Sequence, residues 1–177
     1  PRTYYAIFNS ETLTNQSADG DSSLRFTLYT DAKLAMITRA ITKPTGDYTV
    51  PSTIQVSSET YKVFAIGDDV FSSSPALTSV VIPEGITSIG ENAFDTCSAM
   101  TSVTLPSTLV TIGEYAFTYC RGLTTITIPE GVTTIGDYAF NNCTNLVSIS
   151  LPSTLSSIDS PAFAQCTGLA SISVAEG

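Results

Sequence analysis

The chain has 177 residues, of which 42% are apolar, and a formal net charge of −9. This length suits one domain with a sizeable core, and the apolar content excludes a disordered chain. Residues 1–62 hold six basic and six acidic side chains, whereas residues 63–177 hold ten acidic side chains and one base, Arg121. Such an acidic surface repels phosphate backbones and anionic lipids, so we expect no nucleic-acid partner. No apolar run reaches the roughly 18 residues needed to span a bilayer, so we expect no membrane span in this segment.

The first predicted region is an N-terminal β cap at residues 1–47, because the open end of a repeat array needs a cover. Its stretch RFTLYTDAKLAMIT predicts a hairpin that turns at Asp31-Ala32-Lys33. Residues 48–76 are predicted to be a degenerate first coil, with Pro51 and Phe71 at repeat positions. This coil is longer than the later ones, and the surplus favours a β-hairpin bend near Ser57-Ser58.

Residues 77–177 are periodic and are predicted to form four full coils and a partial fifth. Three residue types recur at intervals of 23 residues, all in one phase. They are the prolines Pro83, Pro106, Pro129 and Pro152, the phenylalanines Phe94, Phe117, Phe140 and Phe163, and the cysteines Cys97, Cys120, Cys143 and Cys166. A fixed period of this length is typical of a solenoid, in which stacked coils share one continuous core.

Each period predicts a strand, a strand stop, a turn and a short helical segment. LTSVTL-type segments alternate apolar and small polar residues, as half-buried strands do, and the proline that follows ends the strand. Gly90, Gly113 and Gly136 are expected to provide a turn at positive φ, and Asp159 to take this place in the last full coil. A short helical turn with Ala-Phe and the cysteine would then return to the next strand.

The frame LxxVxLPxxLxxIGxxAFxxC, at Leu77–Cys97, Met100–Cys120, Leu123–Cys143 and Leu146–Cys166, resembles the leucine-rich repeats of the Bacteroides surface protein A-like (Treponema pallidum-type) family. The resemblance covers roughly residues 48–174. It implies a repeat solenoid of β-rich α/β class. This would be a right-handed leucine-rich-repeat superhelix with 23-residue coils, a parallel sheet on one face, short helical turns on the other and an N-terminal β-hairpin cap. Family members are bacterial cell-surface proteins associated with adhesion, and no shared catalytic residues can be carried over.

The four cysteines and the repeated acids are the first candidate chemical groups. A zinc site needs four converging ligands, whereas these thiols are placed one per coil, so buried small hydrophobes are favoured over disulfides or a metal site. Two columns hold the acids: Glu91, Glu114 and Asp137 at the start of the helical turn, and Glu84 and Glu130 alternating with Ser107 and Ser153. Solvation and capping of helix N-termini are favoured for them over weak cation binding.

An enzyme is not expected. The chain has no histidine, the commonest general base, and no phosphate-binding loop. No base is placed by the pattern to activate a serine or threonine. We therefore predict no catalytic residues, no metal site and no cofactor.

Two surfaces remain as binding candidates. The first is the outward face of the predicted strands, with Ser102, Thr104, Thr125, Thr127, Ser148 and Ser150. The strand face is the usual binding surface of repeat proteins, although hydroxyls also suit any solvated sheet. The second is Tyr115, Tyr119 and Tyr138 on two adjacent coils, which would stack on a sugar or peptide or else pack between neighbouring turns.

The leading functional hypothesis is a non-enzymatic, adhesin-like binding module that is secreted or held on a bacterial surface. Its partner would be a protein or glycan ligand, including host matrix. The alternative is a structural spacer within a larger surface protein. Because the chain ends in SISVAEG directly after a predicted strand, we also expect further repeats or a partner chain to cover this end.

Overall fold

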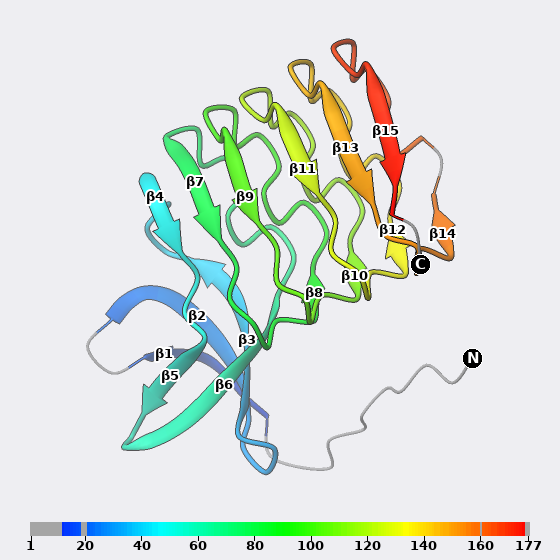
Figure 1. Cartoon of the computed structure of the whole chain (residues 1–177). Helices are drawn as coiled ribbons and strands as arrows, with labels where there is room; N and C mark the ends of the chain where they lie inside the picture. Colours follow the sequence, from blue (N-terminus) through cyan, green and yellow to red (C-terminus); the bar gives the residue numbers. More distant parts are fainter. Residues whose placement is uncertain (1–11, 19–20, 160, 176–177) are drawn as a thin grey trace.

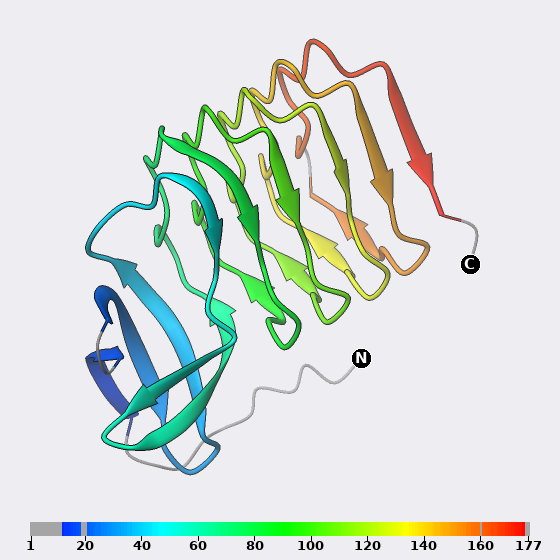
Figure 2. The ribbon, with the colours of Figure 1, turned by 60° about the vertical axis from the view of Figure 1, so that its left-hand side comes forward.

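The computed structural model describes residues 12–18, 21–159 and 161–175. It shows coils stacked side by side, which follow an N-terminal β region (Figures 1 and 2). Residues 1–11 and 19–20 of the predicted cap lie outside the described residues. The predicted repeat solenoid is confirmed. Its expected helical segments are absent from the described residues.

The cap consists of antiparallel strands. β1 (Thr12–Ala18) pairs with β2 (Asp21–Tyr29), and β2 pairs with β3 (Leu34–Ala40). The hairpin predicted at Asp31-Ala32-Lys33 is confirmed, because Tyr29 is paired with Leu34 across the turn. β3 then runs parallel to a strand of the first coil, which joins cap and solenoid in one sheet.

The first coil contains the second predicted hairpin. β5 (Thr53–Val56) and β6 (Glu59–Ile66) are antiparallel, and the two residues between them, Ser57 and Ser58, have φ angles of 52° and 68°. Two left-handed residues in a two-residue loop give a turn whose twist matches that of the strands. This bend absorbs the surplus residues that the sequence showed in this coil.

The strand face is built from six parallel strands that stand in a row in Figure 1. They are β4 (Gly46–Thr49), β7 (Leu77–Val81), β9 (Ser102–Thr104), β11 (Thr125–Thr127), β13 (Ser148–Leu151) and β15 (Ser171–Val174). They form two separate three-stranded sheets, β4-β7-β9 and β11-β13-β15. The parallel sheet was predicted, and its division into two was not.

A second parallel ladder, which the sequence did not reveal, runs along another side of the coils. It consists of β8 (Ser88–Ile89), β10 (Thr111–Ile112), β12 (Thr134–Ile135) and β14 (Ser157–Ile158). β6 pairs with β8, so this ladder continues the sheet of the cap. Strands of two residues are too short to show an alternating pattern in the sequence.

The predicted helical turns are wrong, because no described residue is helical. The segment after each glycine forms consecutive turns in which two residues are left-handed, such as Asn92 (φ 51°) and Thr96 (φ 58°). Its alternate backbone N–H groups point to the next coil: Phe94 donates to the carbonyl of Ala116 at 2.8 Å. A helix would use these N–H donors within its own segment, whereas here the equivalent segment of the next coil provides the carbonyl acceptors.

The predicted role of the glycine column is also wrong. Gly90, Gly113 and Gly136 lie outside the left-handed region, and so does Asp159. Glycine occupies this column because there is little room for a side chain: a Cβ on Gly113 would lie 2.7 Å from the carbonyl carbon of Gly90. Successive coils therefore approach each other closely at this column, and glycine is favoured there because it has no side chain, although the last full coil carries Asp159.

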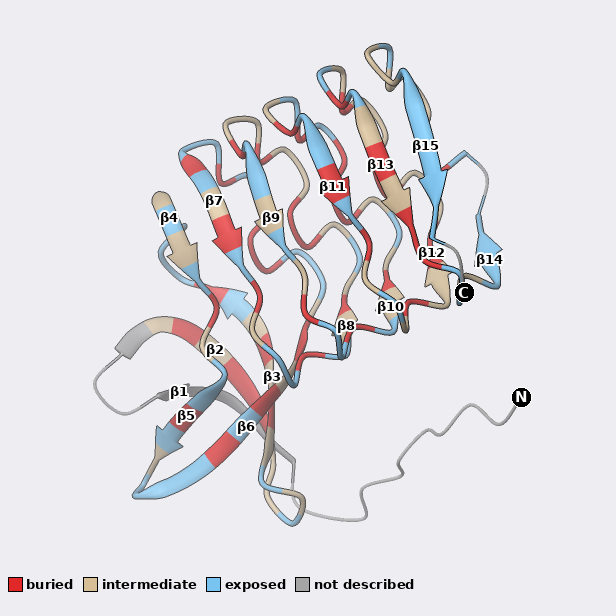
Figure 3. Cartoon of the chain, in the orientation of Figure 1, coloured by how far each residue is buried: buried red, intermediate tan, exposed pale blue. Residues whose placement is uncertain are grey.

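The core is a stack of equivalent side chains, drawn in red along the inside of the coils in Figure 3. The rings of Phe71, Phe94, Phe117, Phe140 and Phe163 stack with centroid distances of 5.2, 5.3, 5.4 and 5.5 Å. Full burial of one such side chain stabilises a fold by about 1.5–3 kcal/mol. The ring stack therefore fixes the coils in register and leaves the strand face open to solvent.

Candidate functional site

All four cysteines are free thiols, and three of them are fully buried. Each Sγ donates to the carbonyl of a phenylalanine in the preceding turn segment: Cys97 to Phe71 at 3.4 Å and Cys120 to Phe94 at 3.3 Å. Burial raises the pKa of Cys97 to about 11 and that of Cys120 well above its usual range. For Cys97 and Cys120 the neutral thiol is thus the stable form, and these two cysteines are poor nucleophiles.

One acid column caps the backbone of neighbouring coils. The carboxylate of Glu84 accepts hydrogen bonds from the backbone N–H (2.9 Å) and hydroxyl (3.0 Å) of Ser107, and Glu130 does the same with Ser153. The Ser107 N–H and hydroxyl hold the pKa of Glu84 below its usual value. The alternation of Glu and Ser along this column is therefore a hydrogen-bonding pattern.

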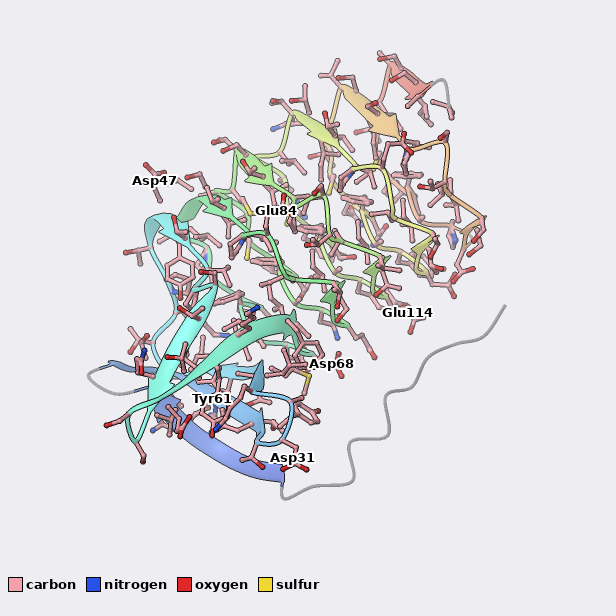
Figure 4. All side chains as sticks on the ribbon, turned by 60° about the horizontal axis from the view of Figure 1, so that its bottom comes forward. Asp31, Asp47, Tyr61, Asp68, Glu84 and Glu114 are labelled. Atoms are coloured by element: carbon pink, nitrogen blue, oxygen red, sulfur yellow. The ribbon has the colours of Figure 1, made fainter. Side chains whose placement is uncertain are left out.

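The other acid column has no helix N-terminus to cap, so that part of the prediction is wrong. Asp68 accepts a hydrogen bond from the backbone N–H of Glu91 at 2.8 Å, and Figure 4 shows Asp68 and Glu114 along one edge of the coils. Within residues 12–18, 21–159 and 161–175, no three acids or cysteines gather in a way that would hold a metal ion.

The predicted hydroxyl face lies on three adjacent strands. Ser102 and Thr104 are on β9, Thr125 and Thr127 on β11, and all four side chains are exposed. Ser148 and Ser150 on β13 are half-buried and lie opposite Thr125 and Thr127 in the parallel register. The structure thus brings six predicted residues to one surface.

The strand face is interrupted between β9 and β11. Elsewhere each coil donates to the one before it, as Thr101 N–H does to the carbonyl of Thr78 (2.9 Å) and Val147 N–H to that of Thr124 (2.8 Å). In this fully described stretch, no such bond joins Thr124 to Thr101, and no strand pairing links β9 with β11. We call this break, with residues 101–105 facing 124–128, the β9–β11 seam.

The seam is confined to the strand face. The same two coils remain joined through β10 and β12 and through the turn segments, where Phe117 N–H donates to the carbonyl of Ala139 at 2.7 Å. Val103 and Leu105 are only half-buried at the seam, whereas the equivalent Ile126 and Ile128 are buried. The result is a groove of about 310 Å³. It is lined by Ser102, Val103, Thr104, Leu105, Thr125, Ile126, Thr127 and Pro129.

The tyrosine cluster is divided by the structure. Tyr115 and Tyr138 stack on each other, with ring centroids 5.1 Å apart and planes 2° from parallel. Tyr119 lies instead under the guanidinium of Arg121, 5.2 Å from the ring centroid. The pair packs between coils, and Tyr119 belongs to a different surface.

Sequence reasoning missed both the seam and the Tyr119–Arg121 contact. A signal for the contact was present, because Arg121 is the one base in residues 63–177. The seam had no comparable signal, since its strands match the repeat frame. No described residue belongs to a helix that is long and apolar enough to cross a membrane.

These features define a class of protein: a leucine-rich-repeat solenoid with a hydroxyl-lined strand face. The family model described as BspA type leucine rich repeat region matches residues 65–177 in six copies, and the chain belongs to this family. The comparison with curated proteins gives no match.

Solved structures of bacterial repeat proteins share the fold. The Treponema pallidum leucine-rich repeat protein is 29% identical, with a TM-score of 0.78, over 88% of this chain and 71% of that one. A leucine-rich cell surface protein from Faecalibacterium prausnitzii is also 29% identical, with a TM-score of 0.61, over 90% of this chain and 55% of that one. The pneumococcal vaccine antigen PcpA, at 18% identity and a TM-score of 0.64, shares the fold over 91% of this chain and 50% of its own.

Proposed function

We propose that the chain is a non-enzymatic binding module of a secreted or surface-held bacterial protein, which binds a protein or glycan ligand, including host matrix, through its strand face. The observation that carries this proposal is the hydroxyl surface of β9, β11 and β13, which is exposed on β9 and β11 and hollowed at the β9–β11 seam. Hydroxyl groups both donate and accept hydrogen bonds, so they suit a polar ligand. A solved structure named as a cell surface protein supports the location.

The chemistry of Cys97, Cys120 and Glu84 agrees with binding rather than catalysis. The thiols of Cys97 and Cys120 are held neutral by burial, and the Glu84 carboxylate is engaged with Ser107. Catalysis by paired carboxylates requires one carboxyl with a raised pKa beside one that stays ionised. The pKa of Glu84 is lowered instead.

The test is a triple substitution on the strand face, Thr104→Lys with Thr125→Lys and Thr127→Lys, probed against an array of matrix proteins and glycans. These exposed side chains tolerate replacement, so the fold should be retained and binding should be lost. A matched control places lysines at Thr87, Val110 and Ser156, which are also exposed but directly precede β8, β10 and β14 of the second ladder. Binding that survives the first variant would place the ligand elsewhere. No ligand on the whole array would favour the spacer, and the lack of Trp, Tyr or Arg anchors on β9, β11 and β13 also supports it.

A further inference from the structure

One coil departs from its neighbours at two positions. The position of Tyr119 is Ser73, Thr96, Asn142 and Gln165 in the other coils, and that of Arg121 is Pro75, Ser98, Thr144 and Thr167. A large aromatic and a cation thus replace small or uncharged residues in this coil alone. Departures from a strict repeat are expected where function, rather than stacking, selects the residue.

Tyr119 occupies a backbone conformation that does not suit it. Its φ is 56°, in the left-handed region, where a bulky side chain is disfavoured and asparagine is tolerated. The equivalent residue of the next coil is Asn142, at the same φ of 56°. Tyr119 is also 37% exposed, so core packing does not explain its presence. The equivalent residues of the other coils, from Ser73 to Gln165, share this left-handed φ, so the conformation belongs to the repeat and makes tyrosine a costly residue at this position.

Arg121 has a held orientation and free donors. Its guanidinium carbon lies over the Tyr119 ring, 5.2 Å from the centroid, and a cation–π contact of this kind does not consume the N–H donors of the guanidinium. The guanidinium forms no ion pair and no hydrogen bond with any residue that the structure describes. A fixed, unpaired guanidinium fits the planar, bidentate geometry of a carboxylate.

The pair lies in a hollow of about 320 Å³ that two hydroxyl side chains complete. Thr96 and Ser98 line it from the segment before β9, and Tyr119 and Arg121 from the segment before β11. These two segments lead into β9 and β11, the strands that line the groove of the β9–β11 seam. One cation and one aromatic ring therefore stand beside a surface whose polar side chains are otherwise hydroxyls.

We propose that Arg121, Tyr119, Thr96 and Ser98 form a binding site for a carboxylate-bearing sugar, such as a sialic or uronic acid residue of a glycan. The proposal rests on the proposed function and names its ligand class. Arg121 binds the carboxylate, Tyr119 holds the guanidinium and offers ring surface to the sugar, and the two hydroxyls bond the sugar hydroxyls. The groove of the seam receives the neighbouring sugar units.

A saccharide fits this surface better than an acidic peptide does. A peptide is held by pockets for its side chains, and the seam groove is open and lined by threonine and serine hydroxyls at its rim. A polyanion would be repelled by the ten acids of residues 63–177, whereas an isolated carboxylate meets one cation. A sugar with one acidic group matches both the single charge and the hydroxyl lining.

The test is a titration of the whole chain with 3′-sialyllactose and a glucuronate-containing tetrasaccharide, with lactose as the neutral partner of the first, followed by amide NMR shifts. We expect shifts at Thr96, Ser98, Tyr119 and Arg121, and at least about tenfold tighter binding of one acidic sugar than of lactose. The two acidic sugars separate the two sources of the carboxylate. Any of three outcomes would overturn the proposal. They are equal binding of lactose and both acidic sugars, no binding of either acidic sugar, and binding of a hexaglutamate peptide alone.

Variants separate ligand binding from structure. Arg121→Gln should reduce acidic-sugar binding to the lactose level, and Arg121→Lys should restore it only in part, since an ammonium group lacks the planar fork. Tyr119→Asn should weaken binding yet raise the melting temperature, by up to about 2–4 °C, because asparagine suits the left-handed backbone. A structural role for Tyr119 would give the opposite change in melting temperature. Arg39→Gln, at an exposed cation on β3, is the charge-matched control and should change nothing.

The outcomes also separate this site from the proposed function. If matrix or glycan ligands bind and the strand-face lysine variant loses them while Arg121→Gln does not, the carboxylate site is wrong and the binding module stands. If Arg121→Gln abolishes acidic-sugar binding while the strand-face variant retains it, the carboxylate site stands and the strand face is not the binding surface.

Discussion

Ile135 and Ile158 occupy the same position in successive coils, yet Ile135 is fully buried and Ile158 is 42% exposed. The strand face repeats this contrast, with Ile149 1% exposed and Ile172 52% exposed. The residues are equivalent in sequence and in register. What differs is the presence of a further described coil on the outer side.

The N-terminal end of the stack is covered. Phe26, Leu28 and Ile37 of the cap are almost fully buried, and β3 pairs with β6 of the first coil. Figure 3 shows the same gradient: red segments run from the cap into the middle coils, and β14 and β15 are pale. Burial in this fold thus depends on the neighbouring coils, and equivalent residues are fully buried only where a coil covers them on both sides.

Phe117→Ala gives the largest expected difference between the covered and open parts of the stack. Phe117 is fully buried between Phe94 and Phe140, so its truncation should lower the free energy of unfolding by about 3–5 kcal/mol. Phe163→Ala should cost clearly less, because Phe163 is half-buried and stacks on Phe140 only. Urea unfolding of both variants measures the difference. Equal losses would show that the last coil is as well packed as the middle ones.

Gly113→Ala is expected to have the next largest effect. A Cβ at Gly113 would meet the backbone of Gly90 at 2.7 Å, and coils on both sides prevent relief, so we expect a loss of about 1–3 kcal/mol. The last coil already carries Asp159 in this column, and Asp159→Ala should change the free energy of unfolding by less than about 0.5 kcal/mol. A neutral Gly113→Ala variant in urea unfolding would refute the close-approach explanation.

Much of the fold was predictable from the sequence because it depends on periodicity and turn chemistry. The 23-residue interval predicts the coils, and the extra residues around Ser57 and Ser58 predict the hairpin that the structure confirms. The turn segments and the glycine column were misassigned for a common reason. Their conformation is set by contacts between coils, such as the bond from Phe94 N–H to the Ala116 carbonyl, and these do not appear within one repeat.

The candidate site was predictable only in part. Alternation placed Thr125 and Thr127 on the strand face, because side chains of a strand point to opposite sides. The seam was not predictable, since its two strands are regular and only their mutual pairing is missing. The departure at Tyr119 and Arg121 was visible in the sequence but gained meaning only when the structure placed the two side chains together.

The buried thiols make the stability of the covered coils depend on pH. Burial raises the pKa of Cys97 to about 11, above the value of 9.0 for an unburied thiol. The unfolded chain therefore loses this proton at lower pH than the folded chain, so the stability contribution is complete below pH 9 and falls as the pH rises towards 11. The loss for this one group is on the order of 2 kcal/mol.

Cys97→Ser tests this dependence, because a serine hydroxyl does not ionise in this range. The column accepts serine, since Ser74 in the preceding coil donates to the carbonyl of Phe71 at 2.6 Å. Denaturant unfolding between pH 8 and 11 should show a shallower loss for the variant than for the parent chain. Parallel curves would mean that Cys97 ionises equally in both states.

Glu84→Gln should give the smallest effect, because Glu84 is an exposed acid that caps Ser107 of the next coil. The two Ser107 hydrogen bonds hold the pKa of Glu84 below its usual value, so their contribution is present above pH 4.5 and is lost as the pH falls through the lower, folded-state pKa. At pH 7 we expect a melting temperature lower by at most about 2 °C, and no difference from the parent chain once both are acidified to pH 2.5. Glu114→Gln, at an exposed acid whose carboxylate makes no described hydrogen bond to another coil, should melt like the parent chain at both pH values. A gap that persists at pH 2.5 would mean that the substitution acts through packing rather than through the charged cap.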